Sequence, residues 1–271
     1  MLLREVEYAR PSSAAEAVRL LDSRDGARAL AGGQTLVNVM KARAASPDVL
    51  VDLNRIDDLR LISVSGDTLQ IGAMATYTQI MAASEVEVSR PILGEVSAQI
   101  ADVQVRNRGT IGGNVCSNDP TNHLPPLLVA LEATFTILGS GGERVVSAKE
   151  FFLGVYMTAV GEGELLTSIS VPAAANAADG FASITIGRDG TCIVNAAASL
   201  EGESPRVAIG CVDAVPVLVR PGGTDEESVH QAVQGARLEP PSDVHASAEY
   251  RLHLAEICAV RALRQAEERG R

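Results

Sequence analysis

The chain of 271 residues contains no tryptophan, and aromatic residues make up only 3% of it. Few side chains are therefore available to stack against unpaired bases, which disfavours a protein that binds single-stranded nucleic acid. Positive charge is also scarce, since the net charge is −11. Surfaces for nucleic acids or anionic membranes need clustered Lys and Arg, so we expect small molecules and other proteins as partners.

Cysteine is rare, and its spacing contains no metal-binding motif. The four cysteines are scattered without a Cys-x-x-Cys pair: Cys116, Cys192, Cys211 and Cys258. The sequence thus predicts free, mostly buried thiols and neither a zinc nor an iron–sulfur site. No apolar run approaches the roughly 20 residues of a membrane span, and residues 1–8 lack the apolar core of a signal peptide. We therefore expect a cytoplasmic protein without a membrane span.

What the chain does have is two glycine pairs, Gly32-Gly33 and Gly112-Gly113, the second with Gly109 nearby. Glycine lets the backbone take positive φ and lets another group approach closely, and exposed amides in such turns bind anions. Either pair alone could be no more than a strand-to-helix turn, but together they favour a pyrophosphate site. Neither pair fits Gly-x-Gly-x-x-Gly or the P-loop Gly-Lys-Ser/Thr, so Rossmann and ATPase folds are disfavoured.

The first part of the chain is expected to form a small α/β unit. Ser13 and Glu16 match a capping box, which predicts a helix running to about Ser23. A strand at residues 27–31 should lead into the first glycine pair. A helix at 35–42 and a strand at 49–53 complete the expected unit.

The next part is expected to mix short helices and strands. Ser65-Gly66-Asp67 is typical of a turn between two strands within residues 59–71. Pro125 and Pro126 favour the start of a helix. The hydrophobic pattern predicts helices at 77–83, 91–101, 127–132 and 149–153, and strands at 134–138, 144–146 and 164–171.

A linker and a smaller domain are expected after that. Residues 172–180 are small and poorly patterned, which is typical of a domain boundary. Three strand patterns follow, at 181–186, 192–200 and 206–212, and they predict a three-stranded antiparallel sheet. Helices are expected at 225–236 and 247–269.

The motifs at residues 31–36, 71–76, 105–114 and 151–154, in this order and spacing, resemble the FAD-binding medium subunit of molybdenum-containing hydroxylases. That family includes the carbon monoxide dehydrogenase and xanthine dehydrogenase group, and the resemblance spans nearly the whole chain. It implies an α+β fold with a two-subdomain α/β FAD-binding domain of the PCMH or vanillyl-alcohol-oxidase type. This domain would cover 1–174, with subdomains at about 1–56 and 57–174, before a C-terminal α+β domain at 175–271.

The resemblance also implies a function. A non-covalent FAD would accept electrons from [2Fe-2S] clusters on a small subunit and pass them to an external acceptor. A large subunit with a molybdenum cofactor would act on the organic substrate, in a dimer of heterotrimers. The chain itself would be an oxidoreductase subunit without catalytic residues or metal ligands.

The pyrophosphate is expected on the amides of residues 32–36 and 110–114. The residues that the resemblance places at the cofactor are Ala31, Gly32, Gly33, Gln34, Thr35, Leu36, Val37, Thr76, Gly109, Thr110, Ile111, Gly112, Gly113, Asn114, Ser117, His123 and Leu166.

Some of these residues have alternatives. Thr76 could cap a helix or lie beside the flavin. Arg106 and Arg108 could bind phosphate or form surface ion pairs. At His123 the family usually has an aspartate; the imidazole could hydrogen-bond the cofactor when neutral, or favour anionic reduced flavin when charged. The chain also departs from the family at Thr185, where a basic residue is more usual, and at 188–190, where the family has a longer turn. The identity of the family's electron acceptor therefore cannot be assumed for this chain.

Two other functions are compatible with the sequence. The chain could be a self-contained FAD oxidoreductase with its own substrate, although the C-terminal part offers no clear acid–base residues. It could also be a scaffold subunit that has lost its cofactor, given the departures at His123 and Thr185.

Overall fold

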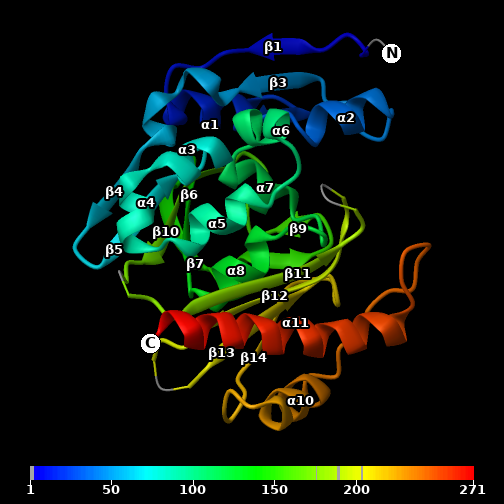
Figure 1. Ribbon diagram of the computed structural model, residues 1–271. Coiled ribbons are helices and arrows are strands. Elements are labelled where there is room, and N and C mark those ends of the chain that lie inside the picture. The colour runs from blue at the N-terminus through cyan, green and yellow to red at the C-terminus, as the bar shows by residue number, and fades with distance from the viewer. Residues whose placement is uncertain (1–2, 175, 188–189, 203) are drawn as a thin grey trace.

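The computed structural model describes residues 3–174, 176–187, 190–202 and 204–271, and Figure 1 shows its three parts. The first part is a parallel sheet in the order β1-β3-β2 with two helices. Its elements are β1 (Glu7–Ala9), α1 (Ala14–Ser23), β2 (Ala27–Leu30), α2 (Leu36–Lys41) and β3 (Val49–Asp52), followed by 3-10 turns at Leu53–Arg55 and Asp57–Arg60. The expected α/β unit is confirmed.

The predicted capping box at α1 is half correct. The hydroxyl of Ser13 accepts a hydrogen bond from the amide of Glu16 at 3.2 Å, as expected. The carboxylate of Glu16, however, accepts from the amide of Ser12 at 2.8 Å and not from that of Ser13. The two acceptors still satisfy free amides at the start of the helix.

The second part is a five-stranded antiparallel sheet in the order β4-β5-β10-β6-β7. Alternate residues of its strands, such as Ile71, Phe135 and Ile169, are fully buried and form the main core. The strands are β4 (Ile62–Ser65), β5 (Thr68–Gly72), β6 (Thr134–Gly139), β7 (Gly142–Ser147) and β10 (Leu165–Pro172), with a hairpin of β8 (Phe152–Gly154) and β9 (Met157–Thr158). The helices are α3 (Tyr77–Ala82), α4 (Ser84–Ser89), α5 (Ile92–Ala98), α6 (Val103–Arg108), α7 (Ile111–Ser117), α8 (Leu124–Ala130) and α9 (Ala148–Phe151).

The third part is an antiparallel sheet covered by the long C-terminal helix, drawn in red in Figure 1. It has four strands and not the expected three: β11 (Asp179–Thr185), β12 (Cys192–Ser199), β13 (Arg206–Gly210) and β14 (Val217–Val219). The helices are α10 (Glu226–Gly235) and α11 (Ala248–Arg269). Strand β14 was missed because it is three residues long, follows Pro216 and is only partly buried, so its pattern is that of a loop.

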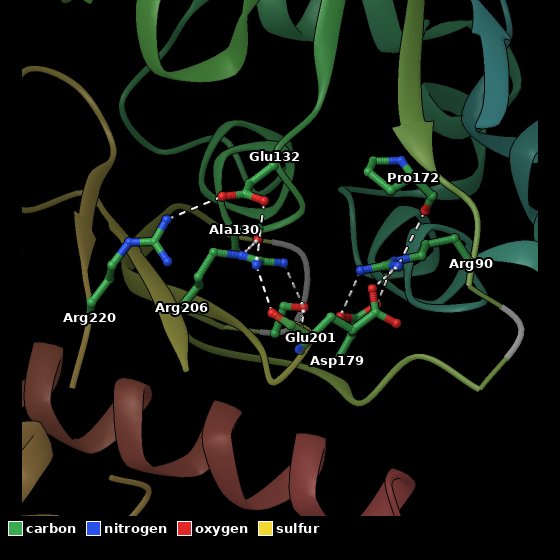
Figure 2. Close-up of polar contacts among 9 residues, drawn as sticks. Arg90, Ala130, Glu132, Pro172, Asp179, Glu201, Arg206 and Arg220 are labelled. Atoms are coloured by element: carbon green, nitrogen blue, oxygen red, sulfur yellow. Dashed lines mark hydrogen bonds and ion pairs between the residues drawn. The ribbon is translucent and has the colours of Figure 1, made fainter. Parts of the chain in front are cut away.

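A buried ion pair joins the third part to the second (Figure 2). The guanidinium of Arg90 is fully buried and lies 2.7 Å from the carboxylate of Asp179 and 2.8 Å from that of Glu201. Nearby, Arg206 donates to the carbonyl of Ala130 at 3.0 Å. Helix α8 also packs against β12 and β13, so the third part is fixed to the second by both polar and apolar contacts.

Candidate flavin-binding site

A cavity of about 1150 Å³ lies between the parallel unit and the antiparallel sheet. Ligand pockets are typically about 300–1,000 Å³, so this one is large enough for a dinucleotide. Most of the predicted site residues line it: Ala31, Gly32, Gly33, Gln34, Thr35, Leu36, Gly109, Thr110, Gly112, Gly113, Asn114, Ser117 and Leu166. The fold thus brings both glycine motifs to one cavity.

The remaining predicted site residues, all within the described part of the chain, lie elsewhere. Val37 lines a smaller cavity of about 290 Å³, which shares residues 31–34 of the first glycine loop with the larger one. Thr76 caps α3 by accepting from the amide of Gln79 at 3.2 Å, and Ile111 is fully buried in the core. His123 is buried beside Phe181, with ring centroids 5.5 Å apart.

The first glycine loop is built so that its carbonyls are bonded and its amides are not. The carbonyl of Gly33 accepts from the amide of Val37 at 3.2 Å, and that of Thr35 from Val39 at 3.0 Å. Within the described chain, no hydrogen bond engages the amides of residues 32–36. Gly33 has a φ of +73°, which glycine adopts without strain. The loop therefore offers a row of free donors at the cavity wall.

The second glycine motif is built differently, and the sequence interpretation of it as an amide cradle does not fit the structure. Its residues lie at the start of helix α7, and the amides of Ile111 and Gly112 donate to the carbonyls of Ala75 and Ala73 at 3.0 and 2.9 Å. The amide of Gly113 donates to the hydroxyl of Thr110 at 3.1 Å, as in a helix N-cap. These donors are used inside the protein and are not available to a diphosphate.

The glycines of this motif are needed for close packing. A β-carbon on Gly112 would stand 2.6 Å from the carbonyl oxygen of Ala73, and one on Gly109 would stand 2.7 Å from the ring of Tyr77. A β-carbon on Gly32, in the first motif, would overlap the carbonyl of Arg108. The glycines thus let the two motifs touch, which places the free amides of the first beside α7.

The side chains of α7 supply polar groups on the facing wall. Asn114 is 8% exposed, and its side-chain oxygen is buried without a partner among the described residues. A buried polar atom without a partner is costly, so a donor from a bound ligand would be stabilising there. Asn122 donates to the hydroxyl of Ser117 at 3.3 Å and so fixes the neighbouring wall. The free amides and this acceptor fit a polar cofactor such as a flavin dinucleotide.

Tyr77 lines the cavity below this wall. Burial raises the pKa of its hydroxyl to about 12, although a hydrogen bond with Asn114 lowers it in part. The phenol therefore stays protonated and uncharged at neutral pH. It is one of several cavity residues that the sequence did not indicate, with Leu53, Ala73, Met74, Tyr156, Met157 and Leu165. Ala73 and Met74 lie in the motif at residues 71–76, and the others come from segments outside the quoted motifs, so the fold brings them together.

Two of the residues with alternatives have well-defined surroundings. Arg106 donates to the carbonyls of Ile100 and Ala101 at 3.0 and 2.6 Å, so it holds the loop before α6, a role that neither alternative included. Burial lowers the pKa of His123 to about 4, although a backbone hydrogen bond at Thr121 opposes the shift. The imidazole is therefore neutral at neutral pH.

Of the two positions at which the chain departs from the family, Thr185 is fully described and the turn at 188–190 is described only in part. The hydroxyl of Thr185 donates to the carbonyl of Gly187 at 3.0 Å. Residues 188 and 189 of the expected short turn lie outside the described residues. Among the residues that are described, no cluster of His, Cys, Asp and Glu could hold a metal ion, and no helix has the length and apolar character to cross a bilayer.

A cavity between two α/β parts, walled by two glycine motifs, is typical of a subunit that binds a dinucleotide cofactor. Residues 4–174 match the family described as the FAD binding domain in molybdopterin dehydrogenase, and the chain belongs to this family. The carbon monoxide dehydrogenase medium chain of Hydrogenophaga pseudoflava is 38% identical, over 96% of each chain. The glyceraldehyde dehydrogenase medium chain of Sulfolobus acidocaldarius is 32% identical, over 96% of this chain and 98% of that one.

Solved structures agree with this assignment. Carbon monoxide dehydrogenase from Hydrogenophaga pseudoflava contains a chain with a TM-score of 0.93 and 35% identity, covering 99% of each chain. Quinoline 2-oxidoreductase from Pseudomonas putida 86 contains one with a TM-score of 0.92 and 32% identity, covering 100% of each. The similarity therefore includes the third part of the chain, which lies outside residues 4–174.

Proposed function

We propose that this chain is the FAD-binding medium subunit of a multi-subunit molybdenum hydroxylase and that it transfers electrons from [2Fe-2S] clusters to an external acceptor. The observation that carries the proposal is the row of unpaired amides at residues 32–36, which faces a cavity of dinucleotide size. Backbone amides of this kind bind phosphate oxygens. A bound FAD would supply the redox chemistry, and the protein would supply position and electrostatics.

The cavity walls suggest how the chain would hold the parts of FAD. The amides of the first glycine loop would bind the diphosphate. The side chains of Asn114 and Ser117 would meet polar groups of the ribityl chain, since both line the cavity and Asn114 has an unused acceptor. Met74 and Leu166 would contribute apolar wall that excludes water from the ring. No residue of the chain is required to transfer a proton or to form a covalent bond.

The finer statements about assembly are part of the same proposal. We assign residues 1–174 to the FAD-binding domain and residues 175–271 to the C-terminal domain. The small [2Fe-2S] subunit and the large molybdenum subunit would complete a heterotrimer, which would pair to give a dimer of heterotrimers. The cytoplasmic location remains a prediction from the sequence.

The hairpin of β8 and β9 is the surface that we assign to the [2Fe-2S] subunit. Leu153, Tyr156 and Met157 are 58%, 62% and 60% exposed, although all are large and apolar. An exposed patch of this kind often marks an interaction site. Tyr156 and Met157 also line the cavity, so a subunit that covers this hairpin would lie next to the flavin. Leu153 belongs to the same exposed hairpin but does not line the cavity, so Leu153→Ser should weaken binding of the small subunit while FAD stays bound. Leu61→Ser, at an exposed position outside the hairpin, should not weaken it.

Purification of the native complex tests the proposed function. The expected result is a complex that contains FAD, iron, sulfide and molybdenum, with one flavin per copy of this chain. A chain that stays colourless after incubation with FAD would support the scaffold alternative. Reduction of the isolated yellow chain by an organic substrate would support the self-contained oxidoreductase.

A further inference from the structure

The first glycine loop is held from behind by a side chain that is not part of either glycine motif. The side-chain nitrogen of Asn54 donates to the carbonyl of Ala31 at 3.1 Å, across 23 positions of sequence. Asn54 lines the smaller cavity but not the larger one, whereas Ala31 lines both. We propose that Asn54 is a positioning residue that turns the loop amides toward the diphosphate, an inference that rests on the proposed function.

The geometry of the peptide bond supplies the mechanism. In a trans peptide the carbonyl of one residue and the amide of the next point in opposite directions, and the described chain has no cis peptide bond. Pulling the carbonyl of Ala31 toward Asn54 therefore turns the amide of Gly32 the other way, toward the main cavity. The other carbonyls of the loop are fixed in the same manner by donors at Gln34, Val37, Asn38 and Val39.

Asn54 differs from those donors because it alone, among the described donors, comes from outside the loop and α2. The others lie within residues 34–39 and move with the loop. Asn54 lies in the turn after β3, and its hydrogen bond connects the loop to the rest of the parallel unit. It is thus the side-chain hydrogen bond that ties the loop carbonyls to the rest of the parallel unit.

The orientation of the Asn54 side chain is itself fixed. Its oxygen accepts from the guanidinium of Arg60 at 3.0 Å, and its nitrogen also donates to the carboxylate of Asp52 at 2.6 Å. A guanidinium can only donate and an ionised carboxylate can only accept, so the amide has one orientation. Asp52 is 3% exposed and accepts another hydrogen bond from the hydroxyl of Tyr8.

Replacement of Asn54 by alanine in the full chain tests the inference. The dissociation constant for FAD should rise about tenfold or more, because a misplaced amide loses a hydrogen bond to a charged group. The urea midpoint of the FAD-free protein should fall somewhat, because Asp52 and Arg60 lose a partner as well. Asn107→Ala, a change at an asparagine outside the loop, should leave FAD affinity unchanged. The ³¹P resonances of FAD bound at saturation should also move, since the groups around the phosphates change.

Asn38→Ala is the second variant, because Asn38 donates to the carbonyl of Gln34 at 2.8 Å and its loss should act in the same direction. It keeps the test valid if Asn54→Ala does not fold. Unchanged FAD affinity in the variants that fold would overturn the inference. It would also be overturned if FAD affinity and the urea midpoint fell together while the ³¹P resonances of bound FAD stayed in place. Failure of the wild-type chain to bind FAD would instead overturn the proposed function.

Discussion

Gly32 lies against the carbonyl oxygen of Arg108, so closely that a β-carbon at residue 32 would overlap that oxygen. The contact joins the first glycine loop to the end of α6, just before the second glycine motif. It is made of backbone atoms, which cannot move aside as a flexible side chain can. The two motifs therefore form one cavity wall. The distance between them depends on residue 32 being a glycine, which has no side chain.

Gly32→Ala should separate the motifs. We expect FAD content to fall and the unfolding free energy to drop by about 1–3 kcal/mol, the usual cost of forcing atoms into a packed site. Flavin absorbance per chain and urea unfolding measure the two effects. Gly141→Ala is the matched control, since nothing lies within 4 Å of the added atom. Normal flavin content in Gly32→Ala would contradict the close contact.

Gly112 and Gly113 should respond differently, although they are neighbours in one motif. A β-carbon on Gly112 meets the backbone of Ala73, so Gly112→Ala should mainly lower stability. Gly113 lines the cavity, and a β-carbon there would lie 2.9 Å from the hydroxyl of Thr110 and 3.6 Å from the β-carbon of Ala31. Gly113→Val should therefore mainly lower FAD content. Thermal unfolding of the FAD-free variants, compared with their flavin content, separates these outcomes, and identical profiles would refute the distinction.

Arg90 should be more important for stability than either of its acidic partners. Arg90→Met leaves the buried carboxylate of Asp179 without its cation, and breaking a buried pair in this way costs about 3–5 kcal/mol. Asp179→Asn should cost less, because Arg90 keeps its contact with Glu201. Urea unfolding at pH 7 measures both. A larger loss in Asp179→Asn would contradict this order.

The Arg90→Met variant should also respond to pH. Burial raises the pKa of Asp179 even in the wild type, and the charge of Arg90 opposes that rise. Without Arg90 the pKa should rise further. A carboxyl group with a raised folded pKa takes up its proton more readily in the folded state, so the stability deficit of the variant should shrink as pH falls. A deficit that stays constant from pH 7 to pH 5 would argue against this account.

His123 should contribute to loss of stability in acid. Its folded pKa is lowered to about 4 from an ordinary value of 6.5, chiefly by burial. As pH falls through this window the unfolded chain binds a proton that the folded chain does not, so up to about 3 kcal/mol is lost. His123→Gln should flatten stability between pH 6.5 and pH 4, as measured by urea unfolding. His253→Gln, at an exposed position, should leave the dependence of the unfolding free energy on pH as it is in the wild type. The same wild-type dependence in His123→Gln would rule out this role for His123.

Local chemistry explains which parts of the fold could be predicted. The N-cap residue Ser13, the turn around Gly66 and the strands with alternating apolar residues depend on neighbours within a few positions. The first glycine loop was predicted as an anion site for the same reason, since a helix pattern follows Gly33 directly. The capping partner of Glu16 was missed by one residue, because adjacent amides offer nearly equivalent partners.

Contacts between distant segments explain what could not be predicted. The sequence interpretation gave the same purpose to Gly33 and Gly112, yet Gly33 provides a left-handed turn and Gly112 provides space for Ala73. Asn54 was not singled out at all, because its role depends on Ala31 lying behind it. Strand β14 forms because it pairs with the free edge of β13, which precedes it by only a short loop. No pattern within Val217–Val219 reveals that this edge is there.

By itself, the sequence determined the family and the order of most helices and strands, and it predicted a phosphate site in residues 31–36. These follow from short-range preferences and from motifs that are contiguous in the chain. The tertiary structure alone decided which glycine motif keeps its amides free, which side chains face the cavity, and which buried charges join the C-terminal domain to the rest. Those properties depend on which backbone groups are already bonded and on how closely distant segments pack, and both are settled only when the chain has folded.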